Sequence, residues 1–248
     1  MTYSEMDYHE SFFVGTLRML KFLKPYGFIF HKYSRSHRDD SVLFTQKSRW
    51  WASKRTVSIW NEGPVWMANI ETVSLFQHTL HQHEIVAKSA HETRAASLCR
   101  LAELVMKDLT DASDLDSVES VITSSSLSSD ELFCTSVLRA FDYLMDKYDY
   151  EVRRVSFNGL EATICFIQRI NRMRQRKVMI RALDNYQRVS VLFTERSTIH
   201  RFSDKTAFVI DADEMNASIE TLSKKFYCKY LKSCVSDKRS RRLYRFNI

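Results

Sequence analysis

One stretch of this sequence occurs twice, and it limits the possible folds more than any other feature. The two copies are residues 42–56 and 164–178. A gapless alignment places Phe44 on Phe166 and Gln46 on Gln168, and it places Lys54 on Arg176 and Arg55 on Lys177. Each copy is an apolar run, a basic turn and a second alternating run. This pattern is typical of a β-hairpin.

The segments around the two hairpins also recur in one order. Apolar residues at steps of three and four predict helices over residues 7–24 and 129–148, each followed by strands. The first four strands are expected at 28–33, 42–46, 55–60 and 65–70, and those of the second half at 151–157, 161–168, 177–183 and 187–194. Helical patterns then cover 72–109 and 213–234, and further strands are expected at 199–201 and 206–210.

These patterns predict an α+β fold of two tandem, internally duplicated modules. Each module is expected to contain a helix, a four-stranded antiparallel meander and a closing helix. The first module covers residues 1–110, and the second, with its basic C-terminal tail, covers 129–248. Residues 111–128 form an acidic, Ser-rich linker. Ser129 is the expected N-cap of the second leading helix, with Asp130 and Glu131 in its first turn.

The overall charge favours an acidic partner. The formal net charge is +7, and 44% of the residues are hydrophobic, which is ample for a buried core. Five cysteines without a C-x-x-C motif indicate reduced thiols and a cytoplasmic protein. No apolar run is long enough to span a membrane, so no membrane association is expected. Oligomeric state does not follow from these features.

Basic side chains are concentrated at the two hairpins and at the C-terminal tail. In the first hairpin the candidates are Lys47, Arg49, Lys54 and Arg55 with the adjacent Trp50 and Trp51. In the second they are Arg169, Arg172, Arg174, Arg176 and Lys177, and in the tail Lys238, Arg239, Arg241 and Arg242. Cations beside an exposed indole suit phosphates and stacked bases. The alternative is that these are solvated hairpin tips, since Lys on an exposed strand commonly prevents that strand from pairing with another chain.

Other polar clusters predict no cofactor and no metal. His78, His81 and His83 do not fall on one helix face and lack a further ligand. Asp211, Asp213 and Glu214 follow a strand and are either Mg²⁺ ligands or helix-capping residues. The sequence contains no Gly-rich phosphate loop and no nucleophile motif.

Three functions are compatible with this sequence. The first is a non-catalytic protein that binds a protein partner, such as an inhibitor, exclusion factor or immunity-type effector from a phage or plasmid. The alternative is a nucleic-acid-binding protein that uses both basic hairpins together with the basic tail. The third is a Mg²⁺-dependent nuclease built on Asp211 and Asp213, although no Lys or His is spaced as a nuclease motif requires.

Overall fold

The fold was analysed in a computed structural model of the full 248-residue chain. The structure describes residues 8–35, 40–46, 53–62, 65–74, 79–88, 94–109, 124, 126–158, 160–197, 203–211 and 214–231.

The chain consists of two successive sets of helices and strands. The first set is α1 (Tyr8–Leu23), the short helix η2 (Lys24–Tyr26), β1 (Phe28–Arg35), β2 (Asp40–Gln46), β3 (Ser53–Glu62), β4 (Val65–Ser74), β5 (Thr79–Lys88) and α2 (Arg94–Leu109). The second set is α4 (Ser129–Ala140), α5 (Asp142–Tyr148), β6 (Glu151–Phe157), β7 (Ala162–Arg169), β8 (Arg174–Leu183), β9 (Arg188–Ser197), β10 (Ser203–Asp211), α6 (Met215–Phe226) and the π-helical turn η3 (Tyr227–Leu231).

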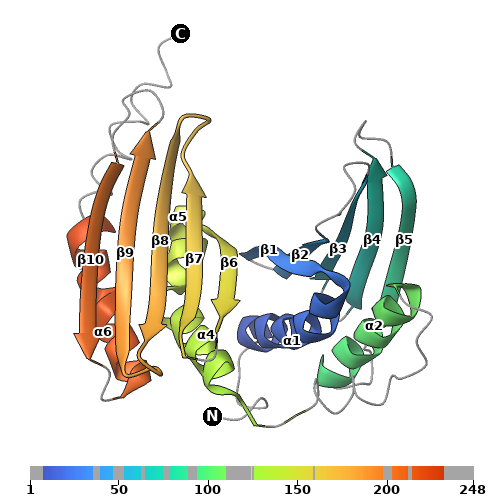
Figure 1. The fold of residues 1–248 in the computed structure, drawn as a ribbon, viewed down its shortest axis with the longest axis horizontal. Helices are drawn as coiled ribbons and strands as arrows, with labels where there is room; N and C mark the ends of the chain where they lie inside the picture. The colour runs from blue at the N-terminus through green and yellow to red at the C-terminus, as the bar shows by residue number, and fades with distance from the viewer. Residues whose placement is uncertain are drawn as a thin grey trace.

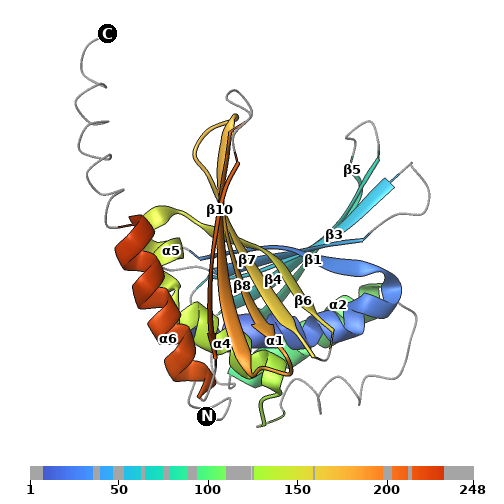
Figure 2. The same ribbon diagram turned by 60° about the vertical axis from the view of Figure 1, so that its left-hand side comes forward.

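The ten strands of the described residues belong to one antiparallel sheet that joins the two halves (Figure 1). The strand order is β10-β9-β8-β7-β6-β1-β2-β3-β4-β5, so each half is a meander and β1 lies beside β6 at the centre. Between these two central strands, Tyr33 of β1 lies opposite Val152 of β6. Figure 2 shows that the outer strands of both halves rise away from the helices, which leaves the sheet strongly twisted.

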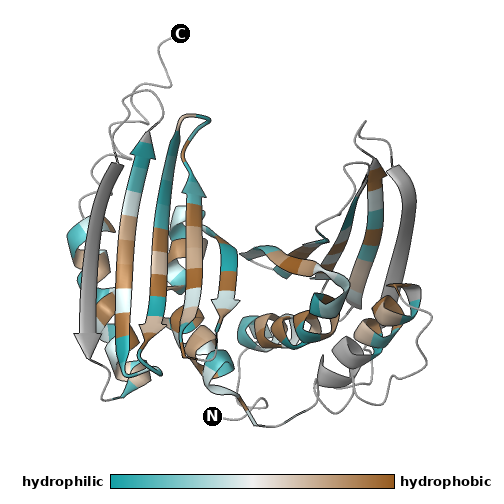
Figure 3. Ribbon diagram, in the orientation of Figure 1, coloured by the Kyte–Doolittle hydropathy of each residue, from teal (hydrophilic) through white to brown (hydrophobic). Residues whose placement is uncertain are grey.

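The helices cover one face of the sheet and build the core against it (Figure 2). Phe12 stacks on Trp66 with ring centroids 5.0 Å apart, and in the second half Phe193 packs on Phe226 at 5.8 Å. Along β8 the buried residues Val178, Ile180 and Ala182 alternate with more exposed ones, and Figure 3 shows hydrophobic and hydrophilic residues interspersed along the strands of the second half. The sheet therefore has one covered apolar face and one face on which no helix of the described residues packs.

The two halves repeat the same local contacts. The Gln46 side-chain amide donates to the Tyr26 carbonyl oxygen at 2.7 Å, and the Gln168 amide donates to that of Tyr148 at 2.5 Å. At the end of the leading helices, Gly27 and Asp149 both adopt the left-handed conformation, with φ of 83° and 56°.

Bulges also fall at matching positions in the first strand of each half. The β1–β2 register shifts between Phe30 and Lys32, and the β6–β7 register shifts between Val152 and Arg154. His31 and Arg153 are therefore the corresponding bulge residues.

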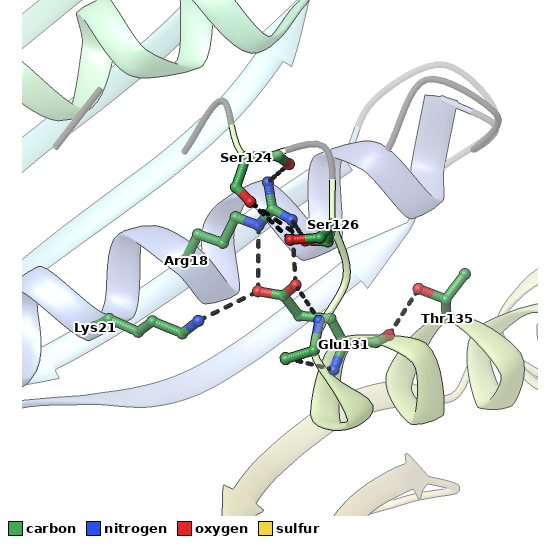
Figure 4. A network of polar contacts seen from close by, with 7 residues as sticks. Arg18, Lys21, Ser124, Ser126, Glu131 and Thr135 are labelled. Atoms are coloured by element: carbon green, nitrogen blue, oxygen red, sulfur yellow. Dashed lines mark hydrogen bonds and ion pairs between the residues drawn. The ribbon is translucent and has the colours of Figure 1, made fainter. Parts of the chain in front are cut away.

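The leading helices of the two halves contact each other through reciprocal ion pairs. Arg18 of α1 donates from Nε and Nη2 to Glu131 of α4 at 3.2 and 3.1 Å (Figure 4). Arg139 of α4 donates from Nε and Nη2 to Glu10 of α1, both at 2.7 Å. The exposed fraction is 1% for the Arg18 side chain and 54% for that of Arg139. The helix pair is thus joined by equivalent residues in unequal surroundings.

Two expectations about the elements were wrong. Each meander has five described strands rather than four, because residues 79–88 form β5 instead of part of a long helix and β10, expected as an added strand, extends the second meander. In that strand Ile85 and Ala87 fall opposite the buried Ala68 and Trp66. The pairing gives hydrogen-bond partners to the backbone N–H and C=O groups along the outer edge of β4. Ser128, not Ser129, is the N-cap of α4, since its hydroxyl accepts from the Glu131 amide while the Glu131 carboxylate accepts from the Ser128 amide.

The gapless hairpin alignment was also wrong beyond the turn. Phe44 pairs with Val57, whereas Phe166 pairs with Val178. Val57 and Val178 are both fully buried, so they are the equivalent residues. Arg55 therefore corresponds to Arg176, and Lys177 corresponds to Thr56. The apolar alternation of the second strand, not the basic residues before it, fixes the register.

Candidate nucleic-acid interface

The face of the sheet without helices is rich in arginine and lysine in the second half. Since side chains alternate along a strand, the neighbours of buried Phe166 and Val178 point to this open face. The register places several cations on this face, among them Arg188 of β9, which pairs with Asp184. We define the basic face as five others: Arg154 on β6, Arg169 on β7, Lys177 and Arg181 on β8, and Arg196 on β9. The four arginines are exposed and Lys177 is half-buried.

The charges of the basic face are not neutralised by neighbouring carboxylates. In the part of the chain that the structure describes, no carboxylate forms an ion pair with any of these five cations. Half-buried Ile167, Met179 and Leu192 lie between them on the same face. A surface that mixes unpaired cations with apolar side chains suits a ligand that has both phosphates and flat apolar groups.

The basic face continues across the centre of the sheet to His31. Burial, and then the positive charges of Lys54, Arg153, Lys32 and Arg169, lower the pKa of His31. Lys54 belongs to the first hairpin and Arg169 to the second, so both hairpins contribute positive charge to this central point. Glu151 offsets part of that charge, because it pairs with Lys32 at 2.5 Å and with Arg153 at 2.8 Å.

The structure separates the basic residues of the second hairpin onto two faces. Arg169 and Lys177 lie on the open face. Arg174 and Arg176 lie on the opposite face, where both bind Glu195, with Arg176 Nε to Oε2 at 3.0 Å. Although burial alone raises the pKa of Glu195, the hydrogen bonds and charges of these two arginines outweigh it, so the pKa is lowered. Arg172 is exposed in the turn.

The first hairpin is described in part. Lys54 is exposed, and half-buried Arg55 donates from Nε to Thr72 Oγ1 at 3.4 Å. The remaining predicted residues lie outside the described residues: Lys47, Arg49, Trp50 and Trp51 of the hairpin, and Lys238, Arg239, Arg241 and Arg242 of the tail.

Sequence reasoning missed part of the basic face because it concentrated on the turns. Arg154, Arg181 and Arg196 lie within or at the ends of strands and were not selected. Lys177 and Arg181 are four residues apart on one strand, so a period of two places them on one face. Counting cations by strand phase would have identified this set.

The described residues do not form a metal site. No group of three His, Cys, Asp or Glu residues among them is arranged to hold a metal ion. Asp211 ends β10 and Glu214 is exposed before α6, whereas Asp213 and His78 lie outside the described residues. No helix in this part of the chain has the length and apolar character of a membrane span.

Comparisons with known proteins add little to this description. No protein-family model matches the sequence, and no curated protein matches it. Among solved structures, one match is the structure of the plant transcriptional regulator PBF-2, at 5% identity over 86% of this chain and 87% of that chain. Its TM-score of 0.23 is too low to support an argument about fold or function.

Proposed function

We propose that this protein is a non-catalytic binding protein for single-stranded nucleic acid, which lies across the open face of the sheet. The observation that carries the proposal is the basic face, whose five cations have no carboxylate partner among the described residues. Folding does not require unpaired cations on one side of a sheet, and such a field attracts polyanions.

The shape of the surface favours a single strand over a duplex. The major groove of B-DNA is about 12 Å wide and admits a helix or a two-stranded ribbon. Neighbouring strands are about 4.8 Å apart, so the cations on β6–β9 span a surface wider than that groove. The helices are packed on the other face and are not free to enter a groove.

Side chains for base contacts are available on the same face. The stems of the arginines and the apolar Ile167, Met179 and Leu192 provide contact area. Across the centre, half-buried Trp60 lies opposite Ser41 and Met67 on the open face of the first half. An indole stacked on a base contributes about 1–3 kcal/mol. Phosphates on the second half and a stacked base on the first are therefore compatible with one bound strand.

A salt titration tests this proposal. Binding of a labelled oligo-dT is followed by fluorescence anisotropy for the wild type and for Arg169→Ser/Lys177→Ser/Arg181→Ser. Each phosphate contact to a single strand contributes about 0.7 to the salt slope, so the triple variant is expected to lose about two units of slope. The matched control is Lys107→Ser/Lys224→Ser/Lys225→Ser, which removes the same charge from exposed positions on the helices. Its slope is expected to be unchanged.

The absence of any binding at about 50 mM salt, where electrostatic contacts are strong, would exclude nucleic acid. Equal losses in the two triple variants would show that net charge, rather than the basic face, attracts the oligonucleotide.

An acidic protein is the second candidate partner, as for an inhibitor, exclusion or immunity-type effector. The observation that favours it is that β5 and β10 are the edge strands of the sheet. An edge strand can accept an extended segment of another protein through backbone hydrogen bonds. A pull-down with and without nuclease treatment separates the candidates, because a protein bound directly remains after nuclease.

We also propose that the two halves arose by duplication of one module that formed a dimer. The shared bulges, the paired Gln46 and Gln168 contacts and the reciprocal ion pairs between α1 and α4 support this. The second half contains both Glu131 and Arg139, so two copies of it can form both ion pairs of the helix interface. Residues 124–248 expressed alone are therefore expected to form a homodimer that Arg139→Glu dissociates. A folded monomeric half would contradict the proposal.

The cysteines support a cytoplasmic location as part of the same proposal. Cys134 and Cys165 are buried free thiols, and Cys228 is an exposed one. Unpaired thiols are typical of a reducing compartment.

A further inference from the structure

A cavity of about 280 Å³ lies where the two halves meet, next to the ion pair of Figure 4. β1 pairs with β6 at Tyr33 and Val152, and the cavity lies toward the start of β1 and the end of β6. It is lined by apolar side chains of both halves, including Leu17, Leu20, Phe28, Phe30, Val155 and Phe157.

The equivalent place at the other end of the central strands is nearly filled. There the cavity measures about 60 Å³ and is lined by Tyr33, Arg35 and Leu138, the counterparts of Val155, Phe157 and Leu17. Tyr33 is larger than Val155, and its ring packs on that of Phe13 at 4.8 Å. Arg35 is held by Asp146 at 3.5 Å. The same backbone frame thus accommodates a filled site, and the 280 Å³ cavity is not a necessary consequence of the fold.

Among the described residues, one cation at the cavity rim has no ion-pair partner. Glu131 is bound by Arg18 and by Lys21, at 3.1 and 3.3 Å, and Asp130 accepts a hydrogen bond from the Tyr186 hydroxyl. Lys24 is exposed and forms no ion pair with any described carboxylate. Ile29, which also lines the cavity, is 42% exposed.

We propose that this cavity binds a small amphipathic anion, with an apolar tail between the two halves and a carboxylate or phosphate at Lys24. The cavity volume corresponds to about nine non-hydrogen atoms, at the ~30 Å³ that a water molecule occupies in the liquid. An apolar lining with a few polar groups that fix orientation is the usual form of a small-molecule site.

Isothermal titration calorimetry of the full-length protein with octanoate, octyl phosphate and octanol tests the proposal. Octanoate or octyl phosphate is expected to bind saturably with one site per chain, and the stronger of the two identifies the head group. Octanol, which keeps the tail but lacks the charge, is expected to bind at least fivefold more weakly.

Two variants and their controls locate the site. Ile29→Trp places a larger ring at a cavity-lining position and is expected to weaken binding at least tenfold, whereas Leu160→Trp, at a residue that does not line the cavity, leaves it unchanged. Lys24→Ala is expected to weaken the binding of both anions about fivefold without changing the affinity for octanol. Lys107→Ala is the control for this variant. Circular dichroism of Ile29→Trp verifies that the variant is folded.

Three results would overturn the proposal. The first is that no compound binds saturably at concentrations below about 5 mM. The second is that a folded Ile29→Trp protein binds the anions as tightly as the wild type does. The third is that octanol binds as tightly as the anions.

Discussion

The two halves of this protein share their buried layer and differ on their open face. Val57 and Val178 are equivalent and both fully buried. On the open face, however, Thr56 and Val73 of the first half stand where the second half has Lys177 and Arg196. The fold requires apolar residues only on the covered face, so the open face is free to diverge. The excess of positive charge on the second half therefore points to binding rather than to stability.

The largest expected effect concerns the shared layer. Arg18→Ala leaves the buried Glu131 without its main partner, and breaking a buried ion pair costs about 3–5 kcal/mol. The equivalent Arg139→Ala removes an arginine that is 54% exposed, so water can take its place beside Glu10, and a loss of about 1–2 kcal/mol is expected. Chemical denaturation of both variants measures the difference. Equal losses would show that the two ion pairs have similar surroundings in solution.

The next largest effect is expected when open-face residues are exchanged between the two halves. Lys177→Thr/Arg196→Val gives the second half the residues of the first, and oligonucleotide affinity is expected to fall about 10- to 50-fold at low salt. The reverse change, Thr56→Lys/Val73→Arg, adds two cations to the first half and is expected to raise the affinity by a smaller factor. Anisotropy titrations measure both. An unchanged affinity in the first variant would argue against the basic face.

A smaller effect is expected in the stability of the fold at acid pH, through Glu131. Burial alone would raise the pKa of Glu131, but the hydrogen bonds from Arg18 and the Ser128 amide, with the charges of Arg18 and Lys21, lower it. A carboxyl group with a lowered pKa stabilises the fold above its unfolded pKa, and this contribution disappears as the pH falls through the folded pKa. The difference in unfolding free energy between wild type and Glu131→Gln is therefore expected to narrow as the pH falls below the ordinary pKa of a glutamate and through the lowered pKa of Glu131. A difference that widens toward acid would contradict this assignment.

The smallest expected effect is a pH dependence of oligonucleotide affinity, which only one of the two bulge residues can cause. Arg153 is permanently charged, whereas its equivalent His31 has a pKa lowered by burial and by Lys54, Arg153, Lys32 and Arg169. Phosphates bound over His31 would raise its pKa, so oligonucleotide affinity is expected to rise a few-fold as the pH falls from about 7.5 to 5.5. His31→Gln is expected to remove this pH dependence while leaving the affinity at pH 7.5 nearly unchanged. The same pH dependence in the variant would place the titrating group elsewhere.

The sequence predicted the elements of the fold better than it predicted the surface. Helix stripes and hairpins followed from apolar periodicity, but β5 was assigned to a helix because His81, Gln82 and His83 interrupt its alternation. The hairpin register failed because matching basic residues carried less structural information than the buried Val57 and Val178. The pairing of Arg174 and Arg176 with Glu195 depends on contact between β8 and β9, which no local pattern encodes.

The proposed nucleic-acid binding requires contact with the open face of the sheet. Lysine acetylation rates, measured by mass spectrometry with and without saturating oligo-dT, test this directly. Lys54 and Lys177 are expected to be protected several-fold, whereas Lys107 on α2 and Lys225 on α6 are expected to react at unchanged rates. Protection of Lys107 and Lys225 with full reactivity at Lys177 would contradict the open-face account.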